Sequence, residues 1–200
     1  MRKRRRMSIG TFAADNQLLL LFLSLLLIGT ACGSALFGSL DENSGKMLSL
    51  AIGAVKPTLE QMAVAWLRSM VMPAVLLAVL FLSGLTAFGV PITVTVPLFF
   101  GLGIGMTQAY YYAQGIGGMG LSCLLVLPRF TIASIGLLMA CAECFRMSVR
   151  FSRILLPGGV IGSLWLPFRL YLVRFIVCVG IAAFSAAVDV ALRTVCAGWL

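Results

Sequence analysis

The sequence predicts an all-α integral membrane protein with about five transmembrane helices, one span broken by a proline, and one amphipathic interfacial helix. Of its 200 residues, 61% are hydrophobic and only 10% are charged, whereas soluble domains contain about 25% charged residues. The mean hydropathy is +1.08. The apolar residues also gather in blocks long enough to cross a bilayer. These observations exclude a soluble enzyme, a secreted disulfide scaffold and a disordered tail.

Residues 1–17 form a basic leader that we expect in the cytoplasm. The net charge is +9, and five of the fifteen Lys and Arg residues lie in the run 2–6. Because this run precedes an apolar block, we interpret it as an orientation signal and expect no nucleic-acid partner. Residues 18–40 are the first span, about 34 Å long as a helix. This block exceeds the core of a signal peptide, so we expect an uncleaved anchor.

Residues 41–69 are predicted to be an extracytoplasmic loop that contains the amphipathic helix. After Pro57, four apolar residues follow at helical spacing: Leu59, Met62, Ala63 and Trp66. This periodicity gives one apolar face. The helix either packs on the ends of the spans or binds a partner.

Residues 70–145 are the predicted core of spans two to four. Two uncharged blocks, 70–88 and 92–112, flank a short break that contains Gly89 and Pro91, which is typical of a helical hairpin. The fourth span, 121–145, is interrupted at Pro128 and Arg129. A charge at mid-depth costs about 2.5–3.5 kcal/mol on insertion scales, so Arg129 requires a partner or a wet cavity.

Residues 146–169 are a basic connector, 170–192 are the fifth span, and 193–200 are a short tail. Asp189 and Arg193 are spaced i, i+4, and Glu143 and Arg146 are spaced i, i+3, so each pair can meet on its helix. Arg174, near the start of the fifth span, can extend its charge toward the interface.

The charge distribution predicts the orientation in the cell membrane. The leader and the 146–169 connector together hold nine Lys or Arg residues, whereas the 41–68 segment holds three basic and three acidic residues. The positive-inside rule therefore places the N-terminus in the cytoplasm and the C-terminus outside.

The residue types give little support to catalysis. The chain has no histidine, which removes imidazole-dependent triads and the commonest metal ligand. Six cysteines lie mostly in apolar segments, where a thiol behaves as a small hydrophobe. Cys141 and Cys144 form a CxxC pair that resembles a redox or metal motif, but no second CxxC or histidine completes a tetrahedral site. A functional role for this pair is therefore the weaker interpretation, and packing is the stronger one. We expect no catalytic residue, metal site or cofactor.

Two glycine pairs predict close helix packing. Gly29 and Gly33 lie one turn apart in the first span, and Gly101 and Gly105 do so in the third. Such small-xxx-small motifs allow two helix backbones to approach closely. The partner is either another helix of this chain or another protein, and a homo-oligomer remains open.

Three segments resemble one known family. They are LTAFGVPI at residues 85–92, FFGLGIG at 99–105 and LVLP at 125–128. In order and spacing, together with the Met-Arg-Lys start, they resemble the stage II sporulation protein M family. Where that family tends to have small polar residues after the Leu-Pro, this chain has Arg129 and Phe130.

The resemblance implies a non-enzymatic membrane subunit of the forespore engulfment complex at the sporulation septum. Its expected partners are the lipid bilayer and membrane-anchored peptidoglycan hydrolases, which such a subunit would scaffold or localise. The alternative is a permease-like subunit of a transporter, which Arg129 and the interrupted fourth span favour.

Overall fold

The computed structural model describes residues 17–39, 62–86, 89–155 and 165–196. In these residues the long helices are α2 (Gln17–Gly38), α4 (Met62–Gly84), α5 (Gly89–Ala113), α7 (Leu127–Leu155) and α8 (Trp165–Cys196). The short helix α6 (Ile116–Leu121) and the π-helical segment η2 (Ser122–Val126) join α5 to α7. Five helical segments of the described part are long and apolar enough to cross a membrane. The predicted all-α membrane fold is confirmed.

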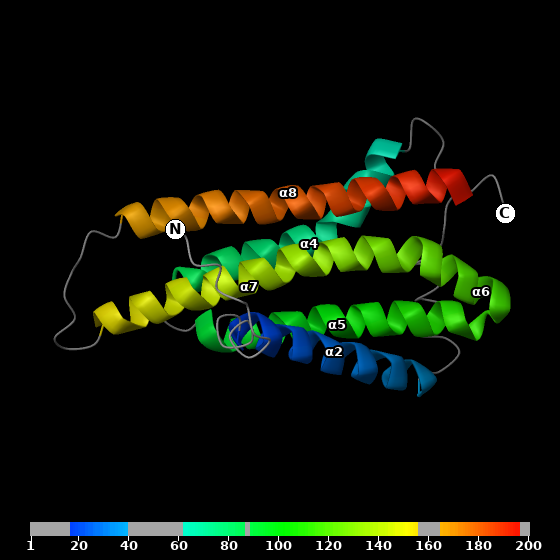
Figure 1. The fold of residues 1–200 in the computed structure, drawn as a ribbon, viewed down its shortest axis with the longest axis horizontal. Helices are drawn as coiled ribbons and strands as arrows, with labels where there is room; N and C mark the ends of the chain where they lie inside the picture. Colours follow the sequence, from blue (N-terminus) through cyan, green and yellow to red (C-terminus); the bar gives the residue numbers. More distant parts are fainter. Residues whose placement is uncertain (1–16, 40–61, 87–88, 156–164, 197–200) are drawn as a thin grey trace, which may run out of the picture.

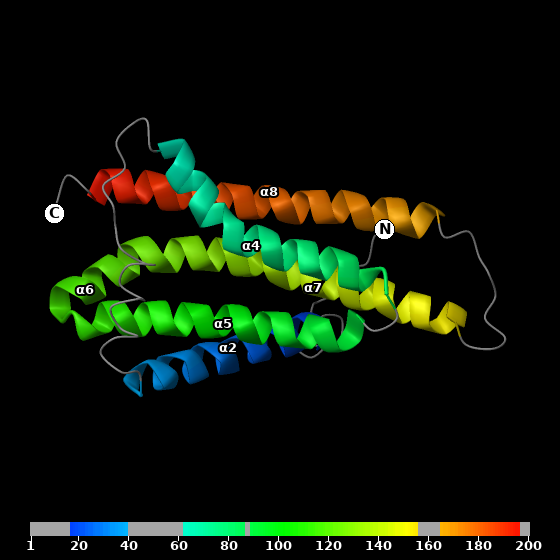
Figure 2. The same cartoon turned by 180° about the vertical axis from the view of Figure 1, so that it is seen from behind.

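The long helices lie side by side and alternate in direction (Figure 1). In this view α8 is at the top, α4 and α7 cross the middle, and α5 and α2 are below; the reverse view keeps this order (Figure 2). One end of the bundle carries α6, the start of α4 and the end of α8, and we call it the α6 end. The connector end is the opposite end, where α7 stops and α8 begins.

Helix α4 includes part of the segment predicted to lie at the interface. Its described residues from Met62 continue into the second span as one helix, while Pro57 and Leu59 lie outside the described residues. The indole Nε1 of Trp66 donates a hydrogen bond to Ala183 O at 3.2 Å, which fastens this part of α4 to α8. Of the apolar face predicted from the periodicity, Trp66 contacts a neighbouring span, whereas Ala63 is exposed.

The interruption of the fourth span is a change of helix type. The π-helical turn η2 ends one residue before Leu127, and α7 continues through Pro128. A proline removes one backbone donor and crowds the carbonyl of residue i−4. A preceding π-turn moves that carbonyl out of the α-helical register, so the helix can continue past Pro128 to Leu155. The described part of the predicted connector before 156, residues 146–155, thus belongs to α7.

The predicted glycine motifs pack against each other. A Cβ on Gly29 would collide with Leu98 O of α5, and one on Gly101 would collide with Leu26 O of α2. Gly33 and Gly105 make equivalent close approaches one turn further along. The question that the sequence left open is answered for this pair, because the two motifs pack α2 on α5 within the chain.

Candidate functional site

Arg129 is held by an acidic residue from another span. Its Nη1 donates to Asp189 Oδ2 of α8 at 3.0 Å, and the Asp189 side chain is only 2% exposed. The guanidinium also lies over the Phe130 ring, 5.2 Å from its centroid, a favourable cation–π geometry. The sequence predicted that Arg129 requires a partner or a cavity, and Asp189 is the partner.

Helix α4 completes the arrangement because of a proline. Pro73 lies inside α4, and its missing N–H leaves the carbonyl of Ser69, four residues earlier, without its usual helical partner. Arg129 Nη2 donates to this carbonyl at 3.4 Å, and Ser69 Oγ donates to Asp189 Oδ2 at 2.6 Å. A helix defect thus supplies an acceptor for a buried cation.

Arg193 supplies a second cation. Its Nε donates to Asp189 Oδ1 at 3.1 Å, which confirms the predicted i, i+4 pair. Both oxygens of the carboxylate are therefore engaged. Ser69, Arg129, Asp189 and Arg193 form what we call the buried charge network, and it joins α4, α7 and α8. Two cations and one anion leave it with one net positive charge.

The buried charge network lies nearer the α6 end than the mid-depth position expected for Arg129. Asp189 is seven residues before Cys196, where α8 ends, which corresponds to about 10 Å along the helix. Arg129 shares this level because it contacts Asp189. Helix α7 spans Leu127–Leu155 and so continues ten residues past the predicted end of the fourth span at 145. Arg129, the third residue of α7, therefore lies further from the middle of the helix than the apolar block indicates.

A lateral cleft of about 150 Å³ opens beside the network. Arg129 and Thr107 are its polar lining residues, and the aromatic rings of Phe99, Phe100 and Phe130 form much of its wall. Arg129 keeps 19% of its side chain exposed. The cleft therefore has a mostly apolar wall and one partly exposed positive charge, that of Arg129.

A second ionic cluster lies toward the connector end. Glu143 Oε1 accepts hydrogen bonds from Arg146 Nη1 at 2.9 Å and from Arg174 Nη1 at 2.6 Å. The first contact confirms the predicted i, i+3 pair, whereas the second joins α7 to α8. Arg174 is 15 residues from Asp189, so the two clusters are about 22 Å apart along α8. A hydrocarbon core about 30 Å thick, centred between them, leaves each about 4 Å from a boundary.

The hairpin residues singled out from the sequence have packing roles. Gly89 begins α5, and a Cβ there would meet Ser83 O and, at 2.9 Å, Ser148 Oγ of α7. Pro91 lies in the first turn of α5, where its missing N–H costs no helical hydrogen bond. These residues bring the α4–α5 turn against α7, away from the buried charge network.

The cysteine pair takes part in core packing. Cys141 and Cys144 are free and fully buried, and Cys144 Sγ lies 3.3 Å from Ser83 Oγ. Within the described residues no group of three or more metal-ligating side chains comes together.

The sequence reasoning missed the links between helices. It did not pair Arg129 with Asp189, nor Arg174 with Glu143. The sequence does contain a signal in the helix-breaking run Pro-Gly-Gly at 157–159, between the fourth and fifth apolar segments. Arg129 and Asp189 each lie 30 residues from Gly159, and Glu143 and Arg174 lie 16 and 15 residues from it. In an antiparallel helical hairpin, residues equally distant from the turn lie at the same level. Ser69 carries no comparable signal.

No protein-family model, curated protein or solved structure matches the chain.

Proposed function

We propose that this chain is a non-catalytic, multi-pass membrane subunit. In this proposal it scaffolds or localises peptidoglycan hydrolases for septal wall thinning and forespore engulfment during sporulation. The N-terminus faces the cytoplasm and the C-terminus lies outside. The identity of the process rests on the resemblance carried by residues 85–92, 99–105 and 125–128.

The observation that supports the scaffold role is that both described acidic residues in the spans form ion pairs between helices. The described acidic residues are Glu143 and Asp189, and each is held by two arginines. Acidic residues within transmembrane helices often mark ion pathways or proton relays. Here both carboxylates bridge helices instead, which favours a rigid bundle.

The segments that carry the resemblance also contribute to this rigidity. Because Gly89 has no Cβ, the α4–α5 turn can pack closely against Ser148 of α7. Gly101 allows the same close approach between α5 and α2. Pro128 lies two residues after the end of the π-turn η2 and immediately before Arg129. These landmarks therefore have structural roles, as a scaffold requires.

Photo-crosslinking in sporulating cells tests the proposal. Benzoylphenylalanine replaces Phe99 or Phe184, whose side chains are 60% and 61% exposed, so that a helix of a partner in the membrane is within reach. Phe22 is fully buried and is the matched control position. We expect a wall hydrolase to be captured from at least one exposed position and not from Phe22. Capture of no wall hydrolase from either exposed position would contradict the proposal.

The cleft beside Arg129 favours a second candidate, the permease-like subunit. Gly103 lines this cleft, and a Cβ there would have no neighbour within 4 Å, so Gly103→Leu should fill the cleft without forcing the helices apart. A permease should lose most of its transport in this variant. A scaffold should retain engulfment, so the same variant separates the two functions.

A further inference from the structure

A polar groove lies between α7 and α8 near the connector end. Its volume is about 300 Å³, at the lower limit of ordinary ligand pockets. Three arginines and one carboxylate line it, together with a few less polar residues. The charged residues are Glu143, Arg146, Arg150 and Arg174, and we call this feature the basic groove.

The basic groove carries more positive than negative charge. Its one carboxylate, Glu143, is already paired with Arg146 and Arg174. Arg150 is exposed and takes part in none of the ion pairs found among the described residues. Three guanidinium groups and one carboxylate leave two net positive charges, which favours an anionic ligand.

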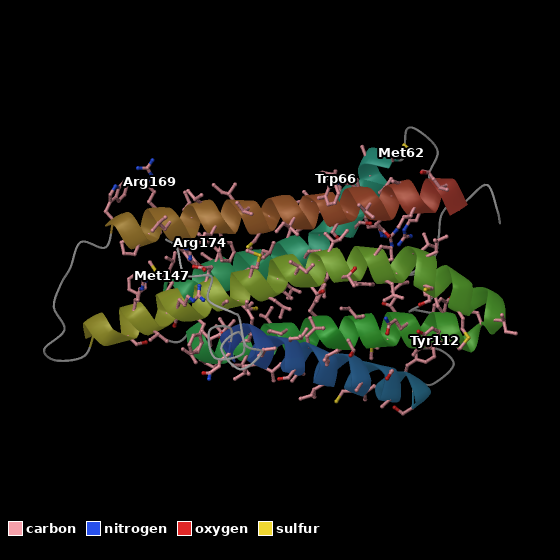
Figure 3. The ribbon with its side chains drawn as sticks, in the orientation of Figure 1. Met62, Trp66, Tyr112, Met147, Arg169 and Arg174 are labelled. Atoms are coloured by element: carbon pink, nitrogen blue, oxygen red, sulfur yellow. The ribbon has the colours of Figure 1, made fainter. Side chains whose placement is uncertain are left out.

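The side chains converge from two helices. Arg174 lies between α8 and α7, near Met147, whereas Arg169 on the same helix points away from α7 (Figure 3). Arg146 and Arg174 are also brought together by their common contact with Glu143. Guanidinium groups at several angles match the tetrahedral oxygens of a phosphate, because each can donate two parallel hydrogen bonds.

Apolar residues continue from the basic groove toward the middle of the bundle. Val177 lies three residues after Arg174 on α8, and Met139 lies four residues before Glu143 on α7; both side chains are exposed, by 51% and 43%. At these spacings they share the helix faces of the charged residues. A ligand seated here therefore meets charge at one end and lipid-facing apolar surface at the other.

We propose that the basic groove binds the phosphate of an anionic phospholipid, with an acyl chain lying over Met139 and Val177. The cluster lies about 4 Å inside a boundary of a centred 30 Å hydrocarbon core, and arginine side chains extend far enough to reach phosphates outside that boundary. Basic pockets between transmembrane helices bind such headgroups. The site is independent of the proposed scaffold function and of the orientation of the bundle.

Native mass spectrometry of the purified, delipidated full-length chain tests this site. The chain is titrated separately with phosphatidylglycerol, phosphatidylcholine, glycerol phosphate and an acidic peptide. We expect saturable binding of one phosphatidylglycerol, at least tenfold tighter than each other ligand. Equal binding of glycerol phosphate would identify a site for a soluble phosphate compound. Tightest binding of the peptide would identify a protein-docking surface, and equal binding of phosphatidylcholine would remove the role of charge. Each of these three results would overturn the proposal.

Two charge-removing variants locate the site. Arg150→Gln should weaken phosphatidylglycerol binding about tenfold, because it removes charge-assisted hydrogen bonds from the guanidinium to the phosphate. Arg169→Gln removes the same charge from the same end of the bundle but outside the basic groove, so its affinity should change less than twofold. Thermal unfolding of both variants checks that each is folded. Equal losses in the two variants would show general surface attraction and would overturn the proposed site.

Discussion

Removing the charge of Asp189 should destabilise the bundle strongly. In Asp189→Asn the side chain keeps its shape and can still accept a hydrogen bond from Ser69. Arg129 and Arg193, however, lose the anion that both of them contact at 3.0 and 3.1 Å. The variant therefore leaves two cations facing each other around a neutral amide.

The size of the effect follows from burial. Removing one partner of a buried ion pair costs about 3–5 kcal/mol. The Asp189 side chain is 2% exposed, but Arg129 and Arg193 keep 19% and 24% of their side chains exposed, so water offsets part of the loss. We therefore expect a loss of about 3 kcal/mol, which lowers the folding equilibrium constant more than a hundredfold.

The matched control is Glu143→Gln. Glu143 also holds two arginines, but those side chains are 50% and 53% exposed. Exposed pairs contribute about 0–1 kcal/mol, so we expect a loss of about 1 kcal/mol. Both variants can be compared by reversible unfolding in mixed detergent micelles with increasing dodecyl sulfate, followed by circular dichroism. A loss below 1 kcal/mol for Asp189→Asn, or equal losses for both, would refute the reasoning.

The same unfolding measurement checks three further predictions. Gly101→Ala should destabilise by about 1–3 kcal/mol, since its Cβ would collide with backbone of α2, whereas Gly103→Ala on the same helix should be neutral or slightly stabilising; equal effects would contradict the packing. Tyr171→Phe should cost about 1 kcal/mol because its hydroxyl donates to Phe81 O at 3.1 Å, and an unchanged stability would count against that bond. Ser122→Ala should not destabilise, because Ser122 Oγ is buried and has no hydrogen-bond partner; a loss above 1 kcal/mol would reveal one.

Much of the fold could be predicted because it depends on local patterns. Uncharged blocks of span length indicated the membrane helices, and the i, i+3 and i, i+4 spacings indicated the Glu143–Arg146 and Asp189–Arg193 pairs, both present at 2.9 and 3.1 Å. These interactions depend on one helix alone, so its periodicity is sufficient to predict them.

The candidate site was harder to predict because it depends on how separate helices are aligned. Arg129 and Asp189 are 60 residues apart, and Ser69 is 120 residues from Asp189. The first contact depends on the register of the α7–α8 hairpin. The second depends on the position of α4 beside α8, to which Trp66 contributes. Hydropathy also does not indicate where a helix ends, since α7 continues to Leu155, ten residues past the apolar block that ends at 145.

Deletion of the gene in its host, followed by membrane-dye microscopy of cells induced to sporulate, tests the proposed scaffold most directly. The prediction is that the mother-cell membrane stalls at the septum, and that both the intact gene and Gly103→Leu restore its movement around the forespore. Normal engulfment without the gene would contradict the proposed function.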